Sequence, residues 1–282
     1  MDHVVRDLPR VSTEPAGWPG SYGDEAQPRV GFFTDTTGCI GCKACEVACK
    51  EWNDVPEALR GFTGASYDNS GRLGADRWRH VAFVEQPNHG VDDGGGLRWL
   101  MSSDVCKHCT RAACLEVCPT GALFRTEFGT VVVQEDVCNG CGYCVPACPF
   151  GVIDRRERDG RVWKCTLCYD RLKVGAEPAC SSACPTKSIQ FGPVTLLRAR
   201  ARERLSTLQG DGLTEARLYG ADDTDGVGGM GAFFLLLDDP EVYGLPPDPV
   251  VTTRDLPRMW KAAGTAAAAL AGLVAAAVLG GR

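Results

Sequence analysis

Cysteine is the residue type with the most chemistry to offer in this sequence. The chain has 16 cysteines in 282 residues, and all of them fall into four runs. The first run has the form C-x2-C-x2-C-x3-C, and variants of it recur three more times. Because no cysteine is left over, one chemistry should account for the whole set. The runs are Cys39, Cys42, Cys45 and Cys49; Cys106, Cys109, Cys114 and Cys118; Cys138, Cys141, Cys144 and Cys148; and Cys165, Cys168, Cys180 and Cys184.

The spacing within these runs is typical of cubane iron–sulfur clusters. Three thiolates of such a run hold one [4Fe-4S] cluster, and the fourth cysteine ligates the other cluster of a two-cluster ferredoxin. A proline follows the fourth cysteine in three runs, as in ferredoxins, and Lys50 replaces it in the first. Gly41, Gly140 and Gly142 lie between ligands, where the backbone has to bend tightly. The sequence therefore predicts four [4Fe-4S] clusters.

Two other uses of cysteine compete with this interpretation. A disulfide framework also takes an even number of cysteines, but such frameworks are typical of short secreted chains. Zinc sites use C-x2-C pairs, although they do not need a third and a fourth cysteine at these spacings. A zinc-rich interaction protein is thus the alternative from a different functional class, and it would contain bound zinc and lack visible absorption.

The spacing alone leaves the pairing of the runs open. Adjacent pairing joins the first run to the second and the third to the fourth, whereas nested pairing joins the first to the fourth. We expect nested pairing, because the second and third runs lie close together with one predicted strand between them, as in a single ferredoxin. The predicted ligand sets are A (Cys39, Cys42, Cys45 and Cys184), B (Cys49, Cys165, Cys168 and Cys180), C (Cys106, Cys109, Cys114 and Cys148) and D (Cys118, Cys138, Cys141 and Cys144).

Short strands and one helix are predicted around the runs. Residues 193–208 predict a helix, with Pro193 in its first turn, Gly210 at its end and a line of arginines that we expect to face solvent. Alternating or β-branched segments indicate the strands. The predicted strands are residues 77–86, 97–103, 130–134, 161–164 and 189–191.

We predict an α+β fold of two ferredoxin-like [4Fe-4S] modules, one inserted in the other, with a C-terminal transmembrane helix. The last helix is expected because residues 262–281 carry no charge over 20 residues, the length that crosses a bilayer. The expected divisions are an N-terminal arm (1–30), an outer two-cluster module (31–55 and 160–192), an inserted loop and hairpin (56–103), an inner two-cluster module (104–159), a helix and docking extension (193–261) and the transmembrane helix (262–281).

Charge and motif content exclude several functions. The net charge of −6 and the pI of about 5.3 give no reason to expect a nucleic-acid partner. The first residues lack the apolar segment of a signal peptide. The sequence shows neither a Ser–His–Asp set nor a phosphate loop, and His108 is expected to be a packed neighbour rather than a ligand. A series of one-electron centres instead predicts an electron-transfer subunit that is not an enzyme by itself.

The sequence resembles the iron–sulfur (beta) subunit of membrane-bound respiratory formate dehydrogenases, a four-cluster subunit of the molybdopterin oxidoreductase class. The resemblance covers residues 30–261, and its cysteine pattern alone also fits the corresponding subunits of polysulfide, dimethyl sulfoxide and nitrate-type reductases or of hydrogenases. The segments that carry it are Cys39-Ile-Gly-Cys-Lys-Ala-Cys, Glu51-Trp-Asn-Asp, Cys138-x-Gly-Cys-Gly-Tyr-Cys, Lys164-Cys-Thr-Leu-Cys-x-Asp-Arg, Glu177-Pro-Ala-Cys, Gly226-Val-Gly-Gly and Gly244-Leu-Pro-x-Asp-Pro.

The resemblance implies nested pairing and a complex with two further subunits. A catalytic alpha subunit would hold molybdenum or tungsten with molybdopterin, and a gamma membrane subunit would carry b haems and reduce quinone. Electrons from formate would then pass through clusters A, B, C and D to a cytochrome b haem.

The two arguments about membrane sidedness disagree. Arg254, Arg258 and Lys261 precede the terminal helix, which under the positive-inside rule places the cluster domain in the cytoplasm. The resemblance implies export of the folded subunit with a partner that bears a twin-arginine signal. We expect a single C-terminal pass in the cell membrane with the cluster domain on the extracytoplasmic (periplasmic) side, because a prefolded complex need not obey the charge rule.

Overall fold

The computed structural model describes residues 27–56, 67–87 and 97–280. Parts of three predicted segments lie outside the described residues. These are most of the expected N-terminal arm, two stretches of the expected loop and hairpin, and Gly281 at the end of the expected transmembrane helix.

A mixed sheet joins parts of the chain that are far apart in sequence. Its strand order is β8-β1-β10-β9, with β1 parallel to β10 and antiparallel to β8. Strand β9 pairs antiparallel with β10 at one edge. The bounds are β1 (Val30–Asp35), β8 (Ile189–Pro193), β9 (Arg217–Tyr219) and β10 (Ala232–Leu236).

The two central strands of this sheet are buried on both faces. Every residue of β1 and of β10 is buried, and the rings of Phe33 and Phe233 stack with centroids 5.5 Å apart. Burying each such ring contributes ~2–3 kcal/mol. We expected the run Phe233–Leu237 to belong to a docking extension. Residues 233–236 instead lie at the centre of the core, where they are fully buried.

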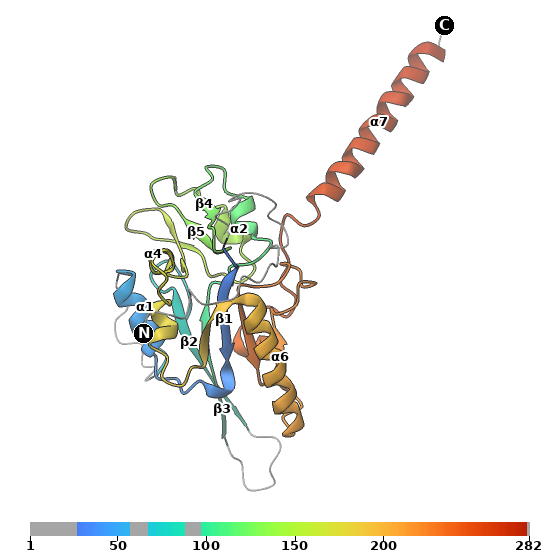
Figure 1. Ribbon diagram of the computed structural model, residues 1–282. Coiled ribbons are helices and arrows are strands. Elements are labelled where there is room, and N and C mark those ends of the chain that lie inside the picture. Colours follow the sequence, from blue (N-terminus) through green and yellow to red (C-terminus); the bar gives the residue numbers. More distant parts are fainter. Residues whose placement is uncertain (1–26, 57–66, 88–96, 281–282) are drawn as a thin grey trace.

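Helix α6 (Val194–Gly210) packs against the sheet, next to β1 in Figure 1. It begins directly after Pro193, which cannot donate a helical hydrogen bond. We expected the arginines of this helix to face solvent. Arg200 and Arg202 are exposed, whereas Arg204 forms an ion pair with Asp35 at 3.1 Å.

Three hairpins carry the connections between the cysteine runs. All three are antiparallel, and the partner strands β4 and β6 were not predicted. The five predicted strands are all present, with ends displaced by up to two residues. β-branched residues indicate that a strand is present, but they do not define where it begins and ends. The hairpins are β2 (Arg79–Pro87) with β3 (Leu97–Val105), β4 (Leu123–Arg125) with β5 (Val131–Val133), and β6 (Asp154–Arg155) with β7 (Val162–Trp163).

Short helices hold the ends of the runs. In the first run the third and fourth cysteines both lie in α1, and in the other three runs a short helix carries the third cysteine and ends just before the fourth. The helices are α1 (Ala44–Trp52), α2 (Ala113–Glu116), α3 (Cys144–Ala147), α4 (Tyr169–Lys173) and α5 (Ala179–Ser182), with 3-10 turns η2 (Thr36–Gly38) and η3 (Pro240–Tyr243).

Helix α7 (Leu256–Gly280) projects away from the rest of the chain (Figure 1) and has no buried residue. Among the described residues it is the one helix that is long and apolar enough to cross a membrane. It begins six residues before the expected start at residue 262, so Trp260 and Lys261 lie within its first turns.

Gly31 of β1 should not tolerate a side chain. A Cβ at this position would lie 1.8 Å from the carbonyl oxygen of Gly231, so alanine would force the central strands apart. We expect Gly31→Ala to lower the free energy of unfolding by about 1–3 kcal/mol. Gly210→Ala is the matched control, because its Cβ would have no heavy atom within 4 Å. Equal thermal midpoints for the two variants, measured anaerobically, would contradict the prediction.

Candidate functional site

The first cysteine run wraps around the start of α1. Gly41 and Lys43 both adopt left-handed conformations, with φ of 65° and 59°, which bend the backbone between the ligands. An added Cβ at Gly41 would lie 2.6 Å from Met101 Sδ and from the Phe83 ring. The β2–β3 hairpin therefore lies directly against this turn and limits position 41 to glycine.

The structure brings the thiols of the predicted ligand set A together. Helix α1 packs against α5, so the first run meets the fourth. Burial raises the pKa of the Cys39 thiol, and the neighbouring thiols of Cys45, Cys184 and Cys42 raise it further. One cavity is lined by all four thiols and by Ser103.

The thiols of ligand set B are all buried. Burial raises the pKa of Cys49 well above its usual range, and Cys165, Cys180 and Cys168 act in the same direction. The Asn53 amide donates to Cys49 Sγ at 3.8 Å and to Cys168 Sγ at 3.7 Å. A side-chain donor thus links two thiols of this set.

Ligand set C surrounds a second cavity, which is lined by Cys106, Cys109, Cys114 and Cys148. Burial raises the pKa of Cys109 well above its usual range, and the other three thiols add to the effect. Burial is also the main reason that the pKa of Cys114 rises to about 12.

Ligand set D gathers around Cys144. Burial raises the pKa of this thiol to about 12, and Cys118, Cys138 and Cys141 repel its thiolate. Burial alone would also raise the pKa of Cys118, but backbone N–H groups that follow it and the Thr120 hydroxyl donate to its sulfur and lower the pKa. The backbone is therefore already arranged to hold an anionic sulfur at this position.

The four ligand sets lie one after another. Between neighbouring sets, a thiol of one set raises the pKa of a thiol in the other, and these pairs relate the sets in the order A, B, C, D. Cys42 in set A and Cys141 in set D are exposed, whereas the other thiols are buried or half-buried. The thiol pairs that link successive sets are Cys45 with Cys180, Cys165 with Cys106, and Cys114 with Cys144.

Buried cations accompany the thiols in the described part of the chain, and sequence reasoning missed them. Arg79, Lys107 and Lys164 are only 3%, 1% and 2% exposed. Lys107 forms an ion pair with Asp104, and Lys164 donates to the Cys165 carbonyl at 3.0 Å. Each lysine adjoins a cysteine in the sequence, which is a usable signal, but Arg79 has no such neighbour.

His108 is a neutral, packed side chain, in agreement with expectation. Its Nδ1 accepts a hydrogen bond from the Val131 N–H at 3.1 Å, so its own proton is on Nε2. Burial holds its pKa well below the usual range, and the charges of Lys164 and Arg125 lower it further.

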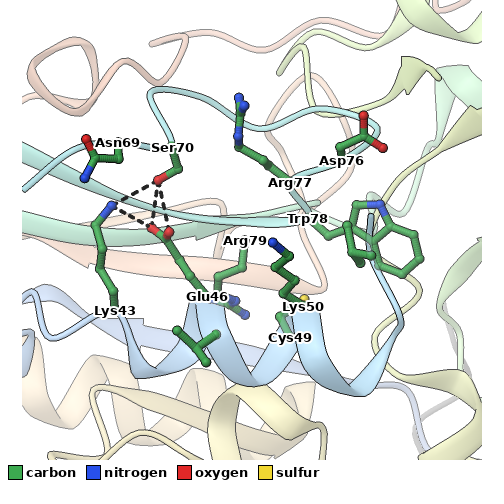
Figure 2. Close-up of a pocket in the computed structure, with 12 residues that line it drawn as sticks. Lys43, Glu46, Cys49, Lys50, Asn69, Ser70, Asp76, Arg77, Trp78 and Arg79 are labelled. Carbon is green, nitrogen blue, oxygen red and sulfur yellow. Dashed lines mark hydrogen bonds and ion pairs between the residues drawn. The ribbon is translucent and has the colours of Figure 1, made fainter. Parts of the chain in front are cut away.

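A separate cavity of about 330 Å³ lies against α1 (Figure 2). Most of the residues that line it are of charged or polar types, and Cys49 is its one cysteine. Glu46 contacts Lys43 at 3.5 Å and accepts from Ser70 at 3.0 Å. Because a single thiol faces it, this cavity is not a cluster site.

Two family models match the cysteine-bearing part of the chain. Both are described as a 4Fe-4S dicluster domain, and they match residues 38–122 and 97–194. The two matches follow the chain in order and overlap at residues 97–122.

Known iron–sulfur subunits match most of the chain. The formate dehydrogenase-O iron–sulfur subunit of Escherichia coli (strain K12) is 39% identical over 93% of this chain and 85% of its own length. The formate dehydrogenase iron–sulfur subunit of Haemophilus influenzae is 39% identical over 88% of this chain and 78% of its own. The B subunit of the anaerobic dimethyl sulfoxide reductase of Escherichia coli is 39% identical over 61% and 77%. The chain therefore belongs to the family of formate dehydrogenase iron–sulfur subunits.

Proposed function

We propose that this chain is the electron-transfer subunit of a formate dehydrogenase complex and contributes no catalytic residue to formate oxidation. The observation that carries the proposal is the series of four ligand sets, with an exposed thiol in the first and the last set. The formate dehydrogenase relatives match 88–93% of the chain, whereas the dimethyl sulfoxide reductase relative matches 61%, which favours formate as the electron source.

Four [4Fe-4S] clusters on ligand sets A to D are the cofactors in this proposal. The thiols fit the group, because each set gathers four sulfurs and sets A and C surround cavities. Among the residues that the structure describes, no three Cys, His, Asp or Glu side chains converge as a single metal ion requires. A zinc ion would need its sulfurs about 2.3 Å from one centre, whereas a cubane holds them at separate corners.

The nested arrangement of two modules is part of the proposal. Strands β1 and β8 pair directly, and α1 packs against α5, which ties residues 31–55 to residues 160–192. The pKa shifts support the same pairing, because the thiols of each set raise the pKa of one of its members: Cys39, Cys49, Cys109 and Cys144. The inner module would then be residues 104–159, inserted between the two halves of the outer one.

The two ends of the series suit different partners. Ile40 and Val47 are 59% and 60% exposed close to the exposed Cys42, an apolar surface that suits a molybdopterin catalytic subunit with molybdenum or tungsten. At the other end, the Thr253 hydroxyl just before α7 donates to Glu116 of α2, next to Cys118 of set D. This contact brings set D near the base of the membrane helix, where a cytochrome b subunit would accept electrons.

The chain controls where electrons can travel. When bound, each cluster supplies a centre that takes up and releases one electron. The protein holds the thiolates in order, excludes water from the buried thiols of set B, and leaves one thiol exposed at each end. Closely spaced centres are needed because tunnelling rates fall steeply with distance.

Cluster content is the first test. Anaerobically purified full-length protein should contain about sixteen iron atoms and about sixteen acid-labile sulfides per chain, because each cubane holds about four of each. Its broad visible absorption should bleach on addition of dithionite. Stoichiometric zinc with little iron would overturn the assignment.

Pairing is tested by ligand substitution. Cys39→Ser and Cys184→Ser should perturb the same electron paramagnetic resonance signal, since both sulfurs belong to set A. Cys138→Ser is the control and should perturb the signal of set D. Loss of that control signal in the Cys184 variant would instead point to another pairing.

We propose that α7 crosses the membrane with the cluster domain on the extracytoplasmic side. Protease added to intact spheroplasts should then digest the cluster domain. A protein that lacks residues 262–282 should leave the membrane with its clusters intact, because the rest of the fold makes no buried contact with this helix. Full protection in spheroplasts, with digestion only in inverted vesicles, would place the domain in the cytoplasm.

A further inference from the structure

Arg79 lies between ligand sets A and B. Its Nη2 donates to Cys180 Sγ of set B at 3.3 Å. Its Nη1 donates to Ser103 Oγ at 3.1 Å, and that oxygen is 3.1 Å from Cys45 Sγ of set A. Arg79 and Ser103 thus connect a ligand of one set to a ligand of the next.

The positive charge of Arg79 has no acidic partner in the part of the chain that the structure describes. The side chain is 3% exposed, its guanidinium lies over the Phe32 ring at 4.9 Å, and its Nε has no hydrogen-bond partner. Burying an uncompensated charge is costly. The groups that can balance this cation are therefore the thiolates of the two ligand sets.

The guanidinium remains charged in this environment. An arginine guanidinium is not deprotonated in proteins, and that of Arg79 donates to Cys180 Sγ and to Ser103 Oγ beside Cys45. Figure 2 shows the Arg79 side chain directed toward α1, close to Cys49 of set B. Arg79 is accordingly a permanent cation with ligands of both sets around it.

We infer that Arg79 is a shared positive charge that raises the reduction potentials of clusters A and B together, an inference that rests on the proposed function. Reduction adds negative charge to a cluster, and a cation at this distance stabilises the reduced form more than the oxidised form. In the transfer step one electron leaves cluster A and enters cluster B. No bond changes, and Arg79 keeps its proton.

The effect should be confined to one half of the series. Lys107, Lys164 and Arg125 are other buried cations at the ligand sets in the described part of the chain, and they lie at set C: Lys107 acts on Cys109, Lys164 on Cys114, and Arg125 donates to the Cys109 carbonyl. They are unaffected by a change at Arg79, so clusters C and D should keep their potentials. Arg79 acts through the ligands that it contacts and is thus a positioning and potential-setting residue.

The test is a potentiometric titration of the intact complex, followed by electron paramagnetic resonance, with the full-length chain. Cys42→Ser and Cys168→Ser assign the signals of clusters A and B. Arg79→Gln should make both clusters harder to reduce by at least tenfold in the reduction equilibrium, which is about 59 mV for one electron. Arg79→Lys should recover most of the shift, because it keeps the charge.

Ser103→Ala separates the two contacts. It removes the hydroxyl beside Cys45 but leaves the arginine beside Cys180, so the potential of cluster A should fall and that of cluster B should change less. Arg98→Gln is the control for loss of a positive charge, because Arg98 pairs with Asp238, outside the ligand sets. This control should leave all four potentials unchanged.

The outcomes separate this inference from the proposed function. A wild-type protein without four clusters would overturn the proposed function itself. Four loaded clusters with unchanged A and B potentials in Arg79→Gln would overturn the role of Arg79 alone. An equal fall in Arg79→Lys would also overturn it, since shape rather than charge would then be responsible. If Arg79→Gln fails to load its clusters, Ser103→Ala decides, and an unchanged potential of cluster A counts against the inference.

Discussion

The crowding of sixteen thiols inside one chain is the constraint on which the rest of this structure depends. Burial and mutual repulsion both raise thiol pKa values, as they do at Cys49 and Cys109, so the folded chain disfavours the thiolate form that a cluster needs. Cluster binding must therefore release protons and should be coupled to folding. Buried cations and backbone N–H donors are the means by which the fold makes such crowding tolerable.

The mixed sheet holds the crowded thiols in fixed positions. Strand β1 ends just before Cys39, and β8 begins shortly after Cys184, so their pairing fixes the two ends of ligand set A against each other. Strand β10 pairs in parallel with β1 on the side opposite to β8, so β1 lies between two strands and is buried. The segment after α6 is consequently part of the core, and its apolar side chains stabilise the cluster region indirectly through β1.

Sequence reasoning found what is local and missed what depends on distant contacts. Ligand spacing and β-branched runs are local, which is why the runs and the predicted strands were visible. The parallel pairing of β1 with β10 joins residues about two hundred positions apart, and a run such as Phe233–Leu236 gives no sign of its partner. Arg79 was hidden for the same reason, because its contacts with Cys180 and Ser103 exist only in the folded chain.

The groups that compensate the charge of the thiolates differ between the ligand sets. In the interior, where water cannot screen a thiolate, permanent cations are placed at the junctions: Arg79 between sets A and B, and Lys164 beside Cys165 of set B with its charge acting on Cys114 of set C. At set D, backbone N–H groups and the Thr120 hydroxyl donate to the sulfur of Cys118 and lower its pKa. The thiols at the junction of sets A and B therefore face a fixed buried charge, whereas Cys118 of set D faces backbone dipoles, so the fold stabilises thiolates by different contacts in different parts of the chain.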